Sequence, residues 1–169
     1  MIVALCAIAE DNGSILVQRH LLDFLSAAFP LNSDYLLRDD FVQLLRRCIF
    51  VLLRRDMSLN RRLHQWLLNR SGEFSSTSQS LGPEEVVDTT FFRAFSLPLI
   101  KKAIEEYLKM DVVEVSKKRD ALDEAKEYQF YFTEVRVCLL FLYFMDRPEI
   151  GSLILAESLS TLLDEASKH

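Results

Sequence analysis

Apolar positions recur along most of this chain at intervals of three and four residues, the spacing of one face of an α-helix. The alternation of apolar and polar residues that typifies β-strands is almost absent. Pro30, Pro83 and Pro148 stand where these helical patterns start or stop, as prolines do at helix boundaries. The pattern therefore predicts an all-α chain.

The first half of the chain predicts helices over residues 15–29, 38–55 and 59–69. The apolar run at residues 1–9 resembles a secretion signal, but it lacks a positively charged beginning and Glu10 follows at once. We therefore expect a helix there as well. In the helix at 15–29, the pattern places Val17 and Phe24 on the inward face, together with Leu21, Leu25 and Ala28, and it places Gln18 on the outward face.

A very short link, Asp56-Met57, separates the second and third of these helices. Ser58 is expected to cap the third helix, and so short a link predicts that the two helices fold back on each other as an αα-hairpin. Trp66 lies on the apolar stripe of the third helix, so we expect it to be buried between the two helices. The other members of that stripe are Leu59, Leu63 and Leu67.

The second half begins with a serine-rich segment, residues 71–82, that lacks periodicity and predicts a mobile loop. A short helix is expected over 83–95, and Ser96 and Pro98 are expected to open another helix. A run of heptad-like spacing follows over residues 121–142, in which Leu139 and Leu142 are among the apolar positions. Phe141 and Phe144 lie off this seam, so a buried repeat helix explains the run better than a coiled coil. Residues 146–151 predict a turn before a last helix.

Six or seven amphipathic helices with short connections predict helical hairpins stacked as a HEAT- or armadillo-like α-solenoid. Residues 1–169 are then expected to form a single helical-repeat fragment. No fixed repeat spacing aligns the hairpins, so a compact helical bundle remains the alternative.

Charge is distributed unevenly along the chain, whose net charge is −5. Residues 38–70 contain eight arginines, no lysine and three acids, a local balance of +5. Arginine rather than lysine favours partners that accept two parallel hydrogen bonds, such as carboxylates and phosphates. The candidate face for an acidic partner or a lipid headgroup comprises Arg46, Arg47, Arg54, Arg55, Arg61 and Arg62.

Two other interpretations of these arginines stay open. The first is a solvated face with ion pairs to Asp39, Asp40 and Asp56. The second is a nucleic-acid-binding helical module that uses the basic face between Arg38 and Arg70. That module would need exposed aromatic side chains between the arginines, whereas Trp66 falls on the apolar stripe, so no nucleic-acid partner is expected.

Residues with recognisable chemistry are scarce. The four glycines are isolated, which excludes the common phosphate-binding loops, and His20 and His64 lack the spacing of a helical zinc site. Cys6, Cys48 and Cys138 are far apart and are expected to be buried core residues in a reducing compartment. The longest apolar run is far shorter than the ~20 residues of a membrane span. We therefore expect no enzyme activity, no cofactor, no metal and no transmembrane helix.

Three segments resemble the N-terminal region of the Dopey family. They read VQRHLLDFLSAAFPLN at residues 17–32, LRRDMSLNRRLHQWLL at 53–68 and MDRPEIGSLIL at 145–155. The second is the most specific of the three. Family members are far longer than this chain, so the resemblance implies an internal piece of their N-terminal region.

The resemblance implies a cytosolic helical-repeat scaffold that attaches peripherally to Golgi and endosomal membranes. It implies action in endosome-to-Golgi protein transport, together with a large Arf-exchange-factor-like scaffold and phospholipid flippases. Phosphoinositide and kinesin-adaptor roles are also linked to this region of the family. The family supplies no catalytic residues that could be transferred to this sequence.

Overall fold

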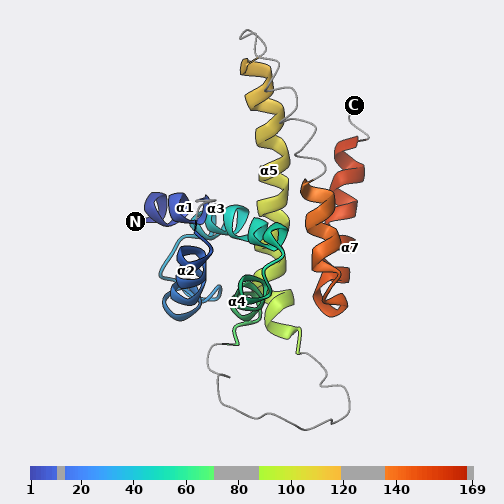
Figure 1. Ribbon diagram of the computed structural model, residues 1–169. Coiled ribbons are helices and arrows are strands. Elements are labelled where there is room, and N and C mark those ends of the chain that lie inside the picture. Colours follow the sequence, from blue (N-terminus) through green and yellow to red (C-terminus); the bar gives the residue numbers. More distant parts are fainter. Residues whose placement is uncertain (11–13, 71–87, 119–135, 167–169) are drawn as a thin grey trace.

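The computed structural model describes residues 1–10, 14–70, 88–118 and 136–166, and within these ranges every regular element is a helix (Figure 1). This confirms the all-α prediction. The loop predicted at residues 71–82 lies outside the described ranges. In chain order the elements are α1 (Ile2–Glu10), α2 (Ile15–Ala28), α3 (Arg38–Cys48), the 3₁₀ helix η1 (Ile49–Arg54), α4 (Met57–Leu68), the π-helical turn η2 (Phe92–Ser96), α5 (Leu97–Lys118), a helical segment at 136–144 and α7 (Pro148–Ala166).

Packing joins helices that are two apart in the chain. Helix α1 lies against α3, α3 against α5 and α5 against α7, whereas α2 packs against α4. Figure 1 shows the long α5 between α3 and α7. These contacts arrange the helices in two layers, α1–α3–α5–α7 and α2–α4, and the buried side chains of both layers form one hydrophobic core. Stacked hairpins and a compact bundle are both compatible with it, and the solenoid stays a prediction.

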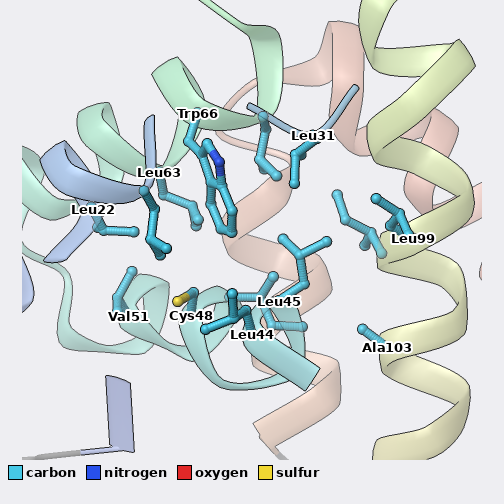
Figure 2. Close-up of a cluster of buried hydrophobic side chains, with 14 of the residues drawn as sticks. Leu22, Leu31, Leu44, Leu45, Cys48, Val51, Leu63, Trp66, Leu99 and Ala103 are labelled. Atoms are coloured by element: carbon cyan, nitrogen blue, oxygen red, sulfur yellow. The ribbon is translucent and has the colours of Figure 1, made fainter. Parts of the chain in front are cut away.

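Trp66 lies in the centre of the core, with only 1% of its surface exposed. Figure 2 shows its indole among Leu31, Leu45 and Leu63. The indole Nε1–H donates a hydrogen bond of 2.9 Å to the carbonyl oxygen of Phe29, the residue that ends α2. The predicted burial is confirmed, and the hydrogen bond shows that this side chain joins α4 to the end of α2.

Helix α2 presents a different face to the core from the one its sequence predicts. Gln18 was expected outside but is 3% exposed, and its Nε2 donates to the carbonyl oxygen of Ala9 at 3.2 Å. Val17 and Phe24 were expected inside but are exposed. The last carbonyl groups of a helix have no N–H donor within that helix. Gln18 supplies such a donor to the carbonyl of Ala9, near the end of α1. The buried apolar residues of α2 are Leu21, Leu22 and Leu25.

The helix predicted over residues 38–55 consists of two elements, because α3 ends at Cys48 and the 3₁₀ helix η1 continues from it. In a 3₁₀ helix, side chains three residues apart lie on the same side, and Ile49 and Leu52 are both fully buried. Arg55 then takes up a left-handed conformation with φ of 54° and ends the element. The predicted αα-hairpin forms in part, since α4 packs against η1, the last part of the helix predicted over 38–55.

The cap of α4 is Asp56, not Ser58 as the sequence predicts. Asp56 Oδ1 accepts a hydrogen bond of 2.8 Å from the backbone N–H of Leu59. The Ser58 hydroxyl instead accepts a short hydrogen bond from Arg62. Either residue type can cap a helix, but Asp56 also has an ion-pair partner on α2, Arg19, that holds it at the first position.

No break separates a helix ending at residue 95 from one starting at Ser96, contrary to the prediction. Helical structure is continuous over residues 90–118, with the π-helical turn η2 just before Pro98. Proline lacks the N–H of the regular ladder and clashes with a carbonyl in the preceding turn, and a wider π turn removes that conflict. Ser96 is buried in this turn and donates its hydroxyl to the carbonyl oxygen of Leu67 at 2.5 Å, which ties α5 to the end of α4.

The segment at 136–144 does not bury the heptad positions of the sequence. Leu139 and Leu142 are exposed, and the buried side chains are Val137, Leu140 and Phe144. Phe144 lies off the heptad seam, so its burial agrees with the preference for a buried helix over a coiled-coil seam. The rest of the run, residues 121–135, lies outside the described ranges.

The turn predicted at residues 146–151 is shorter than expected, because α7 already begins at Pro148. Gly151 lies in the first turns of α7, directly against the backbone of Phe144 and Met145. A Cβ placed at Gly151 would lie 2.9 Å from the backbone nitrogen of Met145 and still closer to the carbonyl oxygen of Phe144. Glycine is therefore what allows α7 to pack so closely on the preceding helix.

Two of the three cysteines are buried as predicted, and the third is not. Cys6 and Cys48 lie in the core, where burial raises the pKa of the Cys48 thiol to about 12. Cys138 is exposed, which corrects the prediction that all three are core residues. The apolar neighbours of Cys138 in the sequence do not report which side of the helix faces the core.

Native alkylation is expected to modify Cys138 first. A thiol reacts as its thiolate, and burial suppresses that form at Cys48 and blocks access to it. Iodoacetamide at neutral pH, followed by peptide mass spectrometry, should show labelling of Cys138 in the folded protein and labelling of Cys6 and Cys48 only after unfolding. Equal labelling of Cys48 and Cys138 in the folded protein would contradict this placement.

Candidate functional site

The six arginines of the predicted face lie in several separate environments. Arg46 and Arg47 come together at one side chain, Gln43 of α3. Arg46 Nη2 donates to Gln43 Oε1 at 2.9 Å, and Arg47 Nη1 donates to the same oxygen at 3.1 Å. The amide nitrogen of Gln43 donates in turn to Glu106 of α5 at 3.3 Å. With Arg46 only 8% exposed, this group belongs largely to the contact between α3 and α5.

Arg62 lies on the opposite packing contact, between α4 and α2. Its Nε is 2.8 Å from Asp23 Oδ1, and its Nη1 donates to the backbone carbonyl of Ser58 at 3.3 Å. A second ion pair across the same two helices joins Arg19 to Asp56 at 2.9 Å. These charges orient α4 on α2.

The remaining three arginines, Arg54, Arg55 and Arg61, differ in exposure. The Arg55 guanidinium lies over the ring of Tyr143 at 5.9 Å, in the range of a cation–π contact. Arg54 is half-buried, and Arg61 is exposed. The structure therefore distributes the six residues over several sides of the first helices, and their role in binding stays a prediction.

The ion pairs suggested by the sequence are assigned differently in the structure. Asp39 pairs with Lys102 of α5 at 2.6 Å, and this hydrogen bond lowers the pKa of the Asp39 carboxyl. Asp56 pairs with Arg19, and the N–H of Leu59 is the main cause of its lowered pKa. Both acids therefore have ion-pair partners outside the six arginines of the face.

A pocket that the sequence reasoning missed opens at the end of α4. It has a volume of about 150 Å³ and is lined by Arg61, His64, Gln65, Leu68, Arg70 and Arg147. Arg147 comes from the turn before α7, so the fold brings two distant segments together, both of which carry the Dopey resemblance. The recurrence of Arg61, Gln65 and Leu68 along one side of α4 is visible in the sequence, but the arrival of Arg147 is not.

His64 is the most deeply buried polar side chain of the pocket, at 5% exposure. Its Nδ1 lies 2.7 Å from the backbone carbonyl oxygen of Asn60. Because that oxygen can only accept, Nδ1 carries the hydrogen in the neutral ring. The other nitrogen, Nε2, is buried and has no hydrogen-bond partner among the described residues.

Burial is the main cause that lowers the pKa of His64 below its ordinary value of 6.5. The carbonyl of Asn60 acts in the opposite direction. Among the charges of the facing turn, Arg147 lowers the pKa of His64, whereas Glu149 and Asp146 raise it. At neutral pH the ring is therefore uncharged in the folded protein.

The free energy of unfolding is expected to fall as the pH drops below about 6.5. The unfolded chain binds a proton at His64 near that pH, whereas the folded chain does so only at lower pH, so protons favour the unfolded state. Asp39, Asp56 and Asp88 have lowered pKa values, and the stability that they contribute is lost only around and below 3.8. Urea unfolding at pH 7.5 and 5.5 measures the effect, and His64→Phe should flatten it. An unchanged pH slope in His64→Phe would refute the assignment.

None of the helices in the described ranges combines the length and the hydrophobicity needed to cross a membrane. Within those same ranges, no three histidine, cysteine or acidic side chains are grouped so that they could hold a metal ion.

The helices and the arginine-lined pocket define an all-α protein. Residues 1–72 match the family described as "Dopey, N-terminal". Protein pad-1 of Caenorhabditis briggsae is 51% identical over 99% of this chain and 7% of its own length. The chain belongs to the Dopey family and corresponds to part of its N-terminal region.

More distant relatives extend the match. The DOP1 homolog of Drosophila melanogaster is 33% identical over 92% of this chain and 6% of its own length. DOP1 of Saccharomyces cerevisiae is 26% identical over 99% of this chain and 10% of its own length. The chain thus spans at most a tenth of the length of these relatives. No solved structure matches it significantly.

Proposed function

We propose that this chain is a non-catalytic scaffold segment in Golgi and endosome protein transport, acting through contacts with proteins and with anionic membranes. The observation that carries the proposal is the match to Dopey relatives along nearly the whole chain. Layered helices support it too, because stacked helices present extended surfaces that suit protein contacts. The location is cytosolic, and attachment to the membranes is peripheral.

The partners follow from the family. They are a large Arf-exchange-factor-like scaffold and a phospholipid flippase, with an anionic, phosphoinositide-containing membrane as the surface. In cells that lack this protein, a cargo that cycles between endosomes and the Golgi is expected to accumulate in endosomes. Normal return of that cargo would contradict the transport role.

Membrane contact is assigned to the arginines of the face that are exposed or half-buried. Arg54 is half-buried, Arg55 and Arg61 are exposed, and Arg47 is half-buried beside Gln43. A basic side chain near an anionic surface contributes about 1 kcal/mol to attachment, and the effect decays within a Debye length. A few such residues suit a weak, salt-sensitive attachment in a scaffold with further contacts.

Sedimentation with phosphoinositide-containing liposomes tests this contact. We expect binding by the wild type, its loss as salt is raised, and strongly reduced binding by the double variant Arg47→Glu/Arg54→Glu. The matched control is Arg38→Glu/Arg93→Glu, which changes the net charge equally at exposed positions outside the six residues. Equal losses in the two double variants would reduce the effect to net charge, and no binding by the wild type would refute membrane contact.

A further inference from the structure

Three guanidinium groups and a buried imidazole surround the pocket at the end of α4. Arg61, Arg70 and Arg147 line it, and no acidic side chain is among the described residues that line it. Like charges that converge on one small space repel each other, so the fold holds them together at a cost in free energy. An anion in the pocket would relieve that repulsion.

The surroundings of the pocket contain acids, but these lie beside it. Glu149 is 3.7 Å from Arg147 Nη1, too long for a strong hydrogen bond. Asp146, in the turn before α7, and Glu149, in the first turn of α7, raise the pKa of His64, and Arg70 lowers the pKa of Asp88. These carboxylates limit the repulsion, but none of them is among the described residues that line the pocket.

His64 is the second, independent observation. Its Nδ1 lies against the carbonyl oxygen of Asn60, and the buried Nε2 has no hydrogen-bond partner in the part of the chain that the structure describes. A buried polar atom without a partner is rare in native proteins and calls for an explanation such as a ligand. When the ring is protonated, Nε2–H becomes a donor that an oxyanion seated in the pocket can satisfy.

We propose that this pocket binds a doubly charged oxyanion, the phosphate group of a monoester, through Arg61, Arg70, Arg147 and His64. Guanidinium groups bind phosphate oxygens through two parallel hydrogen bonds, and several of them around one group match a tetrahedral dianion better than a planar carboxylate. A volume of about 150 Å³ accommodates one such group, since a water molecule occupies roughly 30 Å³.

Protonation of His64 is coupled to the bound anion. An oxyanion in the pocket favours the charged ring, which opposes the effect of burial. Binding and proton uptake are reciprocal, so the affinity rises as the pH falls. For each unit by which the ion raises the pKa of His64, the affinity at low pH exceeds that at high pH by about tenfold.

Sulfate is the probe for this coupling, because it keeps both charges throughout the pH range in which a phosphate monoester loses one. Calorimetric titration of the folded chain with sulfate should show higher affinity at pH 5.5 than at pH 7.5. His64→Phe keeps the size of the ring and should abolish the pH dependence. An affinity for sulfate that does not change with pH in the wild type would overturn the role of His64.

The arginines are tested one at a time. Arg147→Gln and Arg70→Gln are each expected to weaken sulfate and inorganic phosphate binding by about tenfold or more. Arg38→Gln is the control, because it removes one charge from the start of α3, outside the pocket. Equal weakening by Arg38→Gln, or no binding of either ion by the wild type, would overturn the site. Circular dichroism confirms that each variant is folded.

The phosphate group could be carried by a soluble monoester or by a lipid. Vesicles with phosphatidic acid present such a group on a surface, and phosphatidylserine vesicles of equal charge density do not. Binding that prefers phosphatidic acid and is lost in Arg147→Gln assigns the lipid source, whereas inorganic phosphate binding without that preference assigns a soluble one. Arg47→Glu/Arg54→Glu should leave binding of the soluble ion intact, which separates this site from the proposed membrane face.

Discussion

Replacing Trp66 with alanine is expected to lower the free energy of unfolding by about 3–5 kcal/mol. The side chain is almost completely buried, and its removal would leave a large cavity among Leu31, Leu45 and Leu63. The carbonyl oxygen of Phe29 would also lose its hydrogen bond from the indole. Denaturant unfolding of the wild type and the variant measures the difference.

Trp66→Phe is the matched control, because it retains an aromatic ring and removes only part of the volume and the N–H donor. We expect Trp66→Phe to lower the free energy of unfolding, but by less than Trp66→Ala does. Trp66 is the only tryptophan of the chain, so its fluorescence reports on this site alone. A solvent-like emission maximum in the folded protein would refute the burial.

Gly151→Ala is expected to destabilise the protein by about 1–2 kcal/mol, although alanine is normally the better helix residue. The added Cβ would press against the Phe144 carbonyl and the Met145 nitrogen, both of which are backbone atoms. Backbone cannot rotate away as a flexible side chain can, so α7 would have to move off the preceding helix. Thermal and urea unfolding both measure the loss.

Ser152→Ala provides the comparison at the neighbouring position of the same helix. Ser152 is exposed and donates its hydroxyl only to the carbonyl of Pro148 in its own first turn. Its replacement is expected to change the stability by less than about 0.5 kcal/mol. Equal stability of Gly151→Ala and the wild type would show that the close approach is not needed.

Where the predictions from sequence succeeded, they depended on interactions within one helix. The apolar stripe through Leu59 and Leu63 placed Trp66 in the core, and the prolines marked helix boundaries at Pro30 and Pro148. These signals are local, because the period of the helix determines which side chains share a face.

The predictions that failed depended on contacts between separate elements, which the pattern within one helix does not show. Gln18 turns inward because the end of α1 needs a donor, and Asp56 caps α4 while Arg19 holds it from α2. The helix continues through Pro98 because of the π turn η2. In that turn the Ser96 hydroxyl donates a hydrogen bond to the carbonyl oxygen of Leu67. Each of these contacts joins two elements, so no periodicity within either one could show it.

The amino-acid sequence alone determined the all-α class, most helix positions, the burial of Trp66 and the concentration of arginine before residue 70. Tertiary structure decided which of those arginines serve the fold, since Arg62 pairs with Asp23 of α2 and Arg46 is buried beside Gln43, whose amide bonds to Glu106 of α5. It also brought Arg147 to the same pocket as Arg61 and His64, although Arg147 is far from these two residues in the chain. The physical reason is that helix formation follows local periodicity, whereas a site is made by side chains from separate helices, and only their packing brings these together.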